Sequence, residues 1–197
     1  MSVRYATAYR ARIVPWEKAG RAGLPVLERL LAREEQSRPD RRGRALDLGC
    51  GRGAHTKLLV DRGWDAIGVD NVRQAVDVAV HRNELDDARF VIGDVRHLVH
   101  CGVGTAFDLF LDVGCFQGLD DADRMLMATG ITALAEPGAA ILLHTAAHQP
   151  WYRGGHGASA ADLERAFTGW TVTQERDAEV DEADADRQGT WYRLTRS

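Results

Sequence analysis

Three glycines at alternate positions follow directly after a short apolar run that contains a carboxylate. The stretch reads ALDLGCGRG, in which Asp47 precedes Gly49, Gly51 and Gly53. Glycine reaches backbone dihedral angles that other residues avoid, and its missing side chain lets a ligand approach the main chain closely. A helix that starts after such a turn offers unpaired N–H groups to a negatively charged group. This stretch therefore predicts a ligand-binding turn.

A second carboxylate, Asp70, ends the next apolar run, 21 residues after Gly49. An acid at this position commonly binds the hydroxyls of a ribose. The spacing G-x-G-x-G differs from the G-x-G-x-x-G of dinucleotide sites, and Asp47 would repel a pyrophosphate but attract an ammonium or sulfonium group. S-adenosylmethionine combines these cationic groups with a ribose and a carboxylate. The residues thus favour S-adenosylmethionine, and an NAD-dependent oxidoreductase remains the alternative.

The elements that must position these residues alternate between strand and helix. Apolar residues at helical spacing predict helices, and short apolar runs predict strands. The expected helices span 25–36, 55–62, 72–83 and part of 122–134, and the expected strands span 44–48, 65–70, 89–92, 107–113 and 139–144. This order predicts an α/β fold with a doubly wound, mainly parallel sheet, in which a ligand binds beyond the carboxyl ends of the strands. Asn71 is expected to cap the helix that begins at Val72.

The last quarter of the chain has a different pattern. Ser159 and Asp162 have the spacing of a capping box at the start of a helix. Two β-like runs follow at 170–175 and 190–196, and because no helix joins them we expect an antiparallel pair and a sheet of seven strands. We expect one domain, in which residues 1–43 form an N-terminal helical or lid segment, residues 44–144 the cofactor-binding core, and residues 145–197 a substrate-side loop, a helix and a terminal β-hairpin.

The stretch LDLGCGRG followed by WDAIGVD resembles motif I and the strand-2 acid of class I S-adenosylmethionine-dependent methyltransferases of the small-molecule type, the methyltransferase-domain-25 group. Four further stretches are similar to that family: VPWEKAG, FVIGDV, FDLFLDVGCFQGL and LAEPGAAILLH. The last has Ala139 where the family has the second glycine of L-x-P-G-G. The resemblance covers nearly the whole chain, and it implies a Rossmann-like fold, S-adenosylmethionine as cofactor and methyl transfer as the activity.

The resemblance also implies which residues contact the cofactor. By their positions in the motifs these are Trp16, Asp47, Gly49, Cys50, Gly51, Asp70, Asn71, Asp94, Val95, Asp112 and Val113. Asp94 would reach the adenine amine, and Val95 would pack on the ring. Two interpretations stay open for Trp16, which either covers the methionine end or belongs to the core, and for Asp112, which either contacts the ligand or satisfies nearby N–H groups. The Cys50 thiol is assigned no chemistry, because cysteine often serves as a small buried hydrophobe.

Methyl transfer from a sulfonium mainly requires that a nucleophile be held in line with the sulfur and that water be excluded. A hydroxyl or a protonated amine also needs a base, whereas a thiolate or a free amine does not. Gln117 stands where similar proteins often carry a histidine, and its amide can orient an acceptor although it cannot take a proton. His144 and His148 lie in the connection 144–157 and could accept a proton near neutral pH. The alternative is a connection whose aromatic residues only seal the edge of the sheet.

The composition limits which binding partners and locations we expect for this chain. The formal net charge of -4 and the pI near 6.0 argue against a nucleic-acid binder. The three cysteines have no metal-ligand spacing and fit a reducing cytoplasm, and the sequence predicts neither a secretory signal nor a membrane span. We therefore expect a cytoplasmic monomer or homodimer that acts on a small molecule, without metal, nucleic acid or membrane. A non-catalytic S-adenosylmethionine-binding module is a further alternative.

Overall fold

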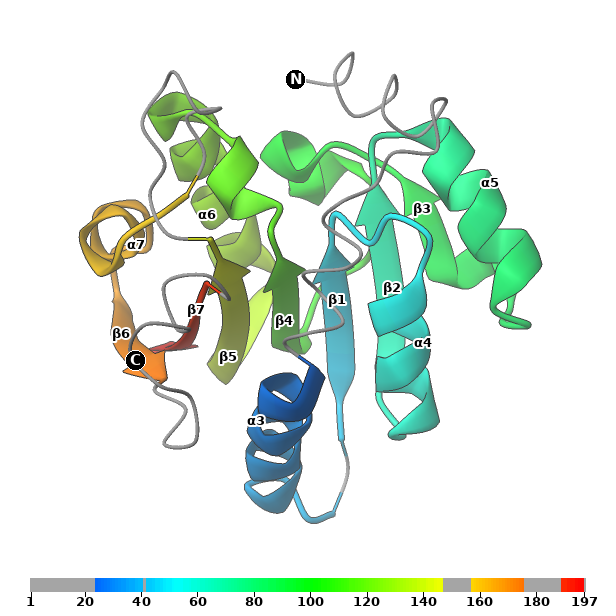
Figure 1. Cartoon of the computed structure of the whole chain (residues 1–197), viewed down its shortest axis with the longest axis horizontal. Helices are drawn as coiled ribbons and strands as arrows, with labels where there is room; N and C mark the ends of the chain where they lie inside the picture. The colour runs from blue at the N-terminus through cyan, green and yellow to red at the C-terminus, as the bar shows by residue number, and fades with distance from the viewer. Residues whose placement is uncertain (1–23, 41, 147–156, 176–188, 197) are drawn as a thin grey trace.

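A seven-stranded sheet forms the centre of the computed structural model, which describes residues 24–40, 42–146, 157–175 and 189–196 (Figure 1). The strands are β1 (Arg44–Leu48), β2 (Asp65–Asp70), β3 (Phe90–Ile92), β4 (Phe107–Val113), β5 (Ala135–Thr145), β6 (Trp170–Glu175) and β7 (Thr190–Arg196). Their order across the sheet is β3-β2-β1-β4-β5-β7-β6. Strands β1 to β5 pair in parallel, and β7 lies antiparallel between β5 and β6. The predicted α/β sheet with its antiparallel C-terminal pair is confirmed.

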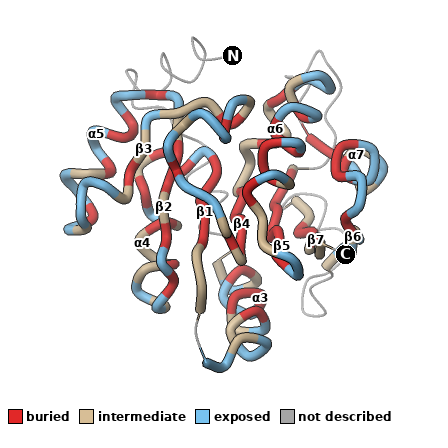
Figure 2. Tube along the Cα trace, turned by 180° about the vertical axis from the view of Figure 1, so that it is seen from behind, coloured by how far each residue is buried: buried red, intermediate tan, exposed pale blue. Residues whose placement is uncertain are grey.

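Helices cover both faces of this sheet. The described helices are α3 (Leu24–Gln36), α4 (Ala54–Asp61), α5 (Arg73–Arg82), α6 (Asp121–Leu134) and α7 (Ala160–Ala166), with short 3-10 helices η1 (Asp87–Arg89), η2 (Val95–His100) and η3 (Phe116–Gly118). Helices α3 and α4 share one apolar cluster with the sheet, and η2, α6 and α7 share another. Figure 2 shows buried strands in the middle and exposed outer sides on the helices. Burial on both faces explains why the strands read as continuous apolar runs.

Successive residues of β1 supply the two apolar clusters in turn. Ala45 joins the cluster that contains Leu27 of α3, whereas Leu46 and Leu48 join the cluster that contains α6. Side chains alternate across a strand, so Asp47 points to the same face as Ala45, where α4 packs. Asp47 therefore lies against α4, where it accepts the Thr56 hydroxyl.

The start of β5 differs from the prediction. The strand begins at Ala135, four residues before the expected start at 139, because Ala135 pairs with Phe107 before the register between β4 and β5 shifts. Pro137 and Gly138 lie inside this first part of the strand, and both residue types are typical of strand edges and bulges. The apolar run therefore predicted only residues 139–144 of β5.

Helix α7 begins as predicted, with a capping box. The Ser159 side chain accepts the Asp162 main-chain N–H, and the Asp162 carboxylate accepts the Ser159 main-chain N–H at 2.9 Å. The two residues thus satisfy main-chain donors that the first turn of a helix would leave unpaired. This cap sets the start of α7 at Ala160.

Candidate active site

The glycine-rich turn lies at the point where the strand order of the sheet changes direction. Strand β1 has β2 on one side and β4 on the other, and the arrowheads of β1, β4 and β5 point to the same edge in Figure 1. A ligand of a doubly wound sheet binds at such a switch point. The N–H groups of Gly49 and Cys50 both donate to the Val69 carbonyl, at 2.8 and 3.0 Å, so the turn is fixed to the end of β2.

All three glycines of the turn adopt positive φ angles, of 69° at Gly49, 54° at Gly51 and 76° at Gly53. At Gly49 a Cβ atom would also lie 2.9 Å from the Cβ of Cys115, and at Gly53 it would lie 2.6 Å from the Phe90 ring. Those two glycines are thus needed for packing as well as for conformation. The packing at Gly49 brings the turn after β4 directly against the turn after β1.

Asp70 ends β2 and is held by two main-chain donors. Its Oδ2 accepts the Gly51 N–H at 2.9 Å, and its Oδ1 accepts the Val72 N–H at 2.8 Å. Burial raises the pKa of this carboxyl, and the two N–H bonds oppose that effect. A carboxylate oxygen has two lone pairs, so each Asp70 oxygen keeps one for a hydroxyl donor. The carboxylate is therefore oriented and can accept a pair of neighbouring hydroxyls.

Asn71 does not cap the following helix, and that prediction is wrong. Asn71 is exposed, helix α5 begins at Arg73, and its N-cap residue is Val72, which makes no side-chain cap bond. The physical reason is the neighbouring carboxylate, because Asp70 already binds the Val72 N–H and sets the entry of the chain into the helix. Asn71 is left at the surface beside Asp70, where its predicted cofactor contact stays a prediction.

Asp47 is buried beneath the turn, with 1% of its surface exposed. Its Oδ2 accepts the Thr56 hydroxyl at 2.6 Å. Burial raises the pKa of Asp47, while His55 and Thr56 lower it. The residue therefore braces the first turn of α4 from below. Cys50, next to it, packs against α5, and burial raises the pKa of its thiol well above the usual value. That burial fits a thiol without chemistry.

Asp94 follows β3 and is bound on both oxygens by one arginine. The Nε of Arg96 lies 2.9 and 3.0 Å from the two carboxylate oxygens, and the Arg96 main-chain N–H also donates to Oδ1 at 3.0 Å. Arg96 lies 3.4 Å from Asp123 in the first turn of α6. The hydrogen bonds from Arg96 lower the pKa of Asp94. Sequence reasoning missed Arg96, although the D-x-R spacing was visible. Val95 between them is buried in the apolar cluster that includes α6.

Asp112 near the end of β4 satisfies local main-chain donors. It is fully buried, its Oδ1 accepts the Cys115 N–H at 2.7 Å, and its Oδ2 accepts the Phe116 N–H at 2.9 Å. Burial raises its pKa to about 7. Of the two interpretations of Asp112, this geometry supports the one in which it shapes the turn. Val113 is half-buried and packs against the cluster on the α3 side.

Gln117 lies in η3, but its carbonyl oxygen is engaged by β5. Its Oε1 accepts the Ala146 main-chain N–H at 2.6 Å and the Thr145 hydroxyl at 3.3 Å. The group expected to orient an acceptor thus binds the chain itself. Thr145 and the buried Arg124 of α6, which contacts the same turn, were not found from the sequence. Both act through main-chain partners distant in sequence, and such contacts leave no local pattern.

His144 lies in β5, as the expected strand 139–144 predicts, so only its additional assignment to the connection 144–157 is wrong. Strand β5 continues to Thr145 because β7 pairs with it there, with His144 opposite Trp191. The His144 ring is 7% exposed and lies 5.0 Å from the Trp191 ring, centroid to centroid. Such a buried ring is poorly placed to take a proton from an acceptor. Trp16 and His148 lie outside the described residues.

Comparison with known proteins shows which protein family carries this glycine-rich turn and its acids. Residues 45–138, which contain the glycine-rich turn, Asp70, Asp94 and Asp112, match the methyltransferase domain family (Methyltransf_25). The chain carries a class I S-adenosylmethionine-dependent methyltransferase domain.

Solved methyltransferases share the fold over most of the chain. A TehB-like methyltransferase from Corynebacterium glutamicum is 20% identical, with a TM-score of 0.67 over 98% of both chains. CalS10, an amino pentose methyltransferase from Micromonospora echinaspora, is 18% identical, with a TM-score of 0.65 over 100% of this chain and 98% of its own. The N-methyltransferase NodS from Bradyrhizobium japonicum, in complex with S-adenosyl-L-homocysteine, is 17% identical, with a TM-score of 0.63 over 78% of both.

The residues of the methyltransferase fit its cofactor, S-adenosylmethionine. Asp70 keeps one spare acceptor on each oxygen, as a pair of ribose hydroxyls would require. The carboxylate of Asp94 is kept ionised by Arg96 and can accept a hydrogen bond from an amine. When ionised, Asp47 would place negative charge beneath the turn, which favours a cationic ligand. The arrangement thus provides acceptors and negative charge, as the donors and cationic groups of this cofactor require.

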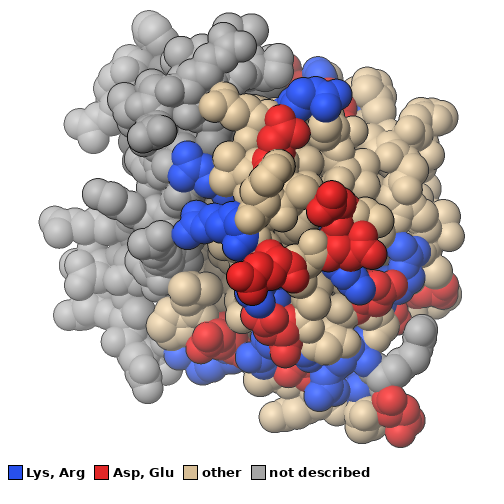
Figure 3. Space-filling model, turned by 90° about the vertical axis from the view of Figure 1, so that its right-hand side faces the viewer, with Lys and Arg blue, Asp and Glu red and all other residues tan. Residues whose placement is uncertain are grey.

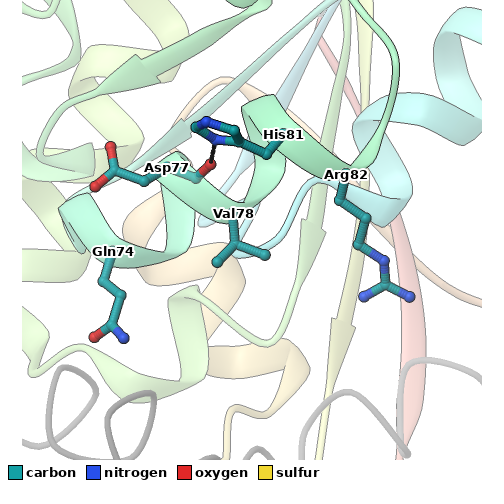
Figure 4. Close-up of a pocket in the computed structure, with 5 residues that line it drawn as sticks. All are labelled: Gln74, Asp77, Val78, His81 and Arg82. Carbon is teal, nitrogen blue, oxygen red and sulfur yellow. Dashed lines mark hydrogen bonds between the residues drawn. The ribbon is translucent and has the colours of Figure 1, made fainter.

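Other features of the methyltransferase lie apart from this site. A depression of about 330 Å³ on the outer side of α5 is lined by Gln74, Asp77, Val78, His81 and Arg82 (Figure 4). All of these come from one helix, and none belongs to the glycine-rich turn. Within the described residues, no cluster of metal-ligating side chains is found. Of the helices in that part of the chain, none has the length and apolar run needed to cross a membrane.

Proposed function

We propose that this methyltransferase transfers the methyl group of S-adenosylmethionine to a small-molecule acceptor through an oxygen, nitrogen or sulfur nucleophile. The observation that carries the proposal is the Asp70 carboxylate, fixed between the Gly51 and Val72 N–H groups at the switch point of the sheet. An acid at this position supports a nucleoside bound beside Asp70, and with the nucleoside there the reacting end of the cofactor would lie toward the turn after β4. Gly49 packs against Cys115 of that turn.

The cofactor supplies an electrophilic methyl group, and the protein has to position the acceptor and exclude water. Among the described residues that surround the β4 turn, the titratable side chains are poor bases. Asp112 is buried and each of its oxygens accepts an N–H, while the His144 ring is buried beside Trp191. We therefore favour a thiolate or a free amine as nucleophile, because neither needs a base. A hydroxyl acceptor would require His148 or another group of the 147–156 connection.

Surface charge supports a small acceptor over a nucleic acid. On the face drawn in Figure 3, Lys and Arg side chains lie among Asp and Glu side chains and form no uniform basic area. A nucleic-acid binder usually gathers its basic residues on one face. CalS10 and NodS, which share the fold, are described as amino pentose and N-methyltransferases. We also infer that residues 1–197 act as one domain, since β6 and β7 complete the sheet that begins with β1.

Ligand binding and a transfer screen test this function. Calorimetric titration with S-adenosylhomocysteine should give saturable binding, whereas NAD should not bind. Transfer of a radiolabelled methyl group should then be measured to a panel of thiols, phenols and amines, and we expect product with a thiol or an amine. Binding of NAD alone would contradict the proposal. Cofactor binding without transfer to any member of the panel would favour a non-catalytic module. Competition by RNA that weakens as salt rises would instead indicate a nucleic-acid substrate.

A further inference from the structure

One side chain ties the turn after β4 to the end of β5. Gln117 Oε1 accepts two hydrogen bonds, from the Ala146 N–H at 2.6 Å and from the Thr145 hydroxyl at 3.3 Å. The turn itself is fixed on its other side, because the Gly114 N–H donates to the His144 carbonyl at 3.1 Å. The two segments are therefore joined at both the main-chain and the side-chain level.

Thr145 extends this tie to the residues that precede α7. Its side chain is fully buried, and its Oγ1 accepts the Ala158 N–H at 2.9 Å. The same hydroxyl lies within hydrogen-bond distance of Gln117 Oε1. One hydroxyl thus links the main chain that precedes the 147–156 connection to the main chain that follows it.

Arg124 of α6 adds a third contact from the opposite side. Its Nη2 donates to the Gly157 carbonyl at 2.8 Å and lies 3.4 Å from the Gln117 carbonyl, and its Nε donates to the Phe116 carbonyl at 3.3 Å. Its guanidinium carbon lies 5.0 Å from the centre of the Phe116 ring. Only 8% of Arg124 is exposed. A buried cation must be matched by acceptors, and here these are the carbonyls of the two segments together with the Asp121 carboxylate, 3.5 Å from Nη1.

The segment held in this way also touches the cofactor turn. Cys115 packs directly on Gly49, and its N–H is bound by Asp112. Cys115, which touches the cofactor turn, is therefore only two residues before Gln117, which binds the Ala146 N–H.

We propose that Gln117, Thr145 and Arg124 form a clamp that positions the main chain at Ala146 and at Gly157–Ala158 for acceptor binding. All three are positioning residues, and the inference rests on the proposed methyl transfer. One hydrogen bond contributes a small part of the stability of a domain. A shift of about 1 Å in a positioned group can lower a rate by a factor of about 100. The clamp should therefore affect turnover of the acceptor far more than folding or cofactor affinity.

Paired substitutions in the full chain separate a positioning role from a structural one. Gln117→Met removes the accepting oxygen, whereas Gln117→Glu keeps it. Thr145→Val removes the hydroxyl, whereas Thr145→Ser keeps it. The control is Thr129→Val, because Thr129 is exposed and its hydroxyl binds within its own helix α6, at the Met125 carbonyl. The measurements are amide hydrogen exchange, the Kd of S-adenosylhomocysteine, and kcat and KM with the most active thiol, phenol or amine of the screening panel.

The expected pattern is specific to each variant. Gln117→Met should speed amide exchange at Ala146, and Thr145→Val should speed it at Ala158. Both should lower kcat/KM about tenfold or more while the Kd of S-adenosylhomocysteine changes less than twofold. Gln117→Glu, Thr145→Ser and Thr129→Val should stay within about threefold of wild type. The double variant Gln117→Met/Thr145→Val should lose less kcat/KM than the product of the two single losses, since both residues act in one contact.

Three results would overturn the clamp. Unchanged exchange at Ala146 in Gln117→Met would show that the carboxamide does not hold that peptide. A loss in Gln117→Glu as large as in Gln117→Met would indicate direct contact of the amide N–H₂ with the acceptor. A parallel loss of S-adenosylhomocysteine affinity would place the turn in the cofactor site. A wild-type chain that binds no S-adenosylhomocysteine would refute the proposed function, and the exchange data would still decide whether the clamp exists.

Discussion

At the residue scale, the binding chemistry depends on acids whose surroundings differ strongly. Asp70 is oriented by two N–H groups and keeps free acceptor capacity. Asp94 is paired with Arg96, which keeps it ionised, while Asp47 and Asp112 are buried among main-chain and hydroxyl donors. Four carboxylates near one edge of the sheet therefore have separate tasks. Two can meet a ligand, and two shape the turns that hold it.

Asp70→Ala should weaken the binding of S-adenosylhomocysteine by about 1.5–3 kcal/mol, because the ribose hydroxyls would lose their acceptors. The substitution also frees the Gly51 N–H, so the turn should loosen. Isothermal titration calorimetry measures the change. Asp77→Ala is the matched control, since Asp77 is exposed on the outer side of α5 (Figure 4). An unchanged Kd for Asp70→Ala would refute its role in binding.

Asp112 predicts a pH dependence of stability. Burial raises the folded-state pKa of Asp112 to about 7, above the unfolded value of about 3.9. The folded chain therefore holds this proton more tightly, and the contribution of Asp112 to stability is lost as pH rises from about 4 to about 7. Relative to Asp112→Asn, the wild-type free energy of unfolding should fall by roughly 3–4 kcal/mol over this range.

Urea unfolding at several pH values between 4 and 8 measures the effect of Asp112. The control is Asp77→Asn, whose unfolding free energy should follow that of the wild type at each pH. A constant difference between wild type and Asp112→Asn across the range would contradict a raised pKa at this position.

At the element scale, ion pairs connect helices to distant strands. Arg96 joins the end of β3 to the first turn of α6 through Asp94 and Asp123. Glu34 of α3 is fully buried and accepts from Arg193 of β7 and from Arg38. The Arg96 pairs tie the residues after β3 to α6, and the Glu34 pairs tie α3 to β7 and to Arg38.

Arg96→Met should lower the free energy of unfolding by about 1 kcal/mol at pH 7, the usual size for a partly exposed pair. Because Arg96 lowers the folded-state pKa of Asp94, this stabilisation is present above the unfolded pKa and is lost as pH falls through the folded value. The difference between wild type and Arg96→Met in urea unfolding should therefore shrink on acidification below about pH 4. Arg82→Met on the exposed end of α5 is the control, and an effect of Arg96→Met that persists at pH 2 would argue against the ion pair.

Glu34→Ala should lower the free energy of unfolding by about 3 kcal/mol, because it leaves Arg38 and Arg193 without their buried partner. Glu28→Ala, on the exposed side of the same helix, should change stability by less than about 0.5 kcal/mol. Thermal and urea unfolding of the two variants measure the difference. Equal stabilities would mean that α3 is held by its leucines alone, chiefly Leu27 and Leu31, which are fully buried.

At the scale of the whole molecule, apolar runs predicted the central strands well because β1, β4 and most of β5 are buried on both faces. The bounds of β1, β2, β4, β6 and β7 agree with the prediction residue for residue. The first residues of β5 escaped it, since Pro137 and Gly138 interrupt the apolar pattern there. His144 was predicted both as the last residue of this strand and as the first of the connection, because nothing local shows that pairing with β7 extends the strand to Thr145.

The candidate site was predicted less completely than the fold. Its local part, the glycine turn with Asp70, follows from residue types and spacing. Its long-range part does not, as Arg124 and Gly157 or Gln117 and Ala146 are about 30 residues apart and meet only in the folded chain. Side chains that bind the main chain leave no periodicity, so only the structure shows them. All of the predicted cofactor contacts, including those of Trp16, Asn71, Val95 and Val113, stay predictions.

The order of strands has a consequence for biosynthesis. Strand β7 comes after β6 in the chain but lies between β5 and β6 in the sheet. While the chain leaves the ribosome, β5 therefore exposes an unpaired edge and β6 has no neighbour until β7 has been synthesised. An open, apolar strand edge invites association with other chains. Aggregation during expression should accordingly respond most to substitutions in β7, even where these leave the finished protein stable.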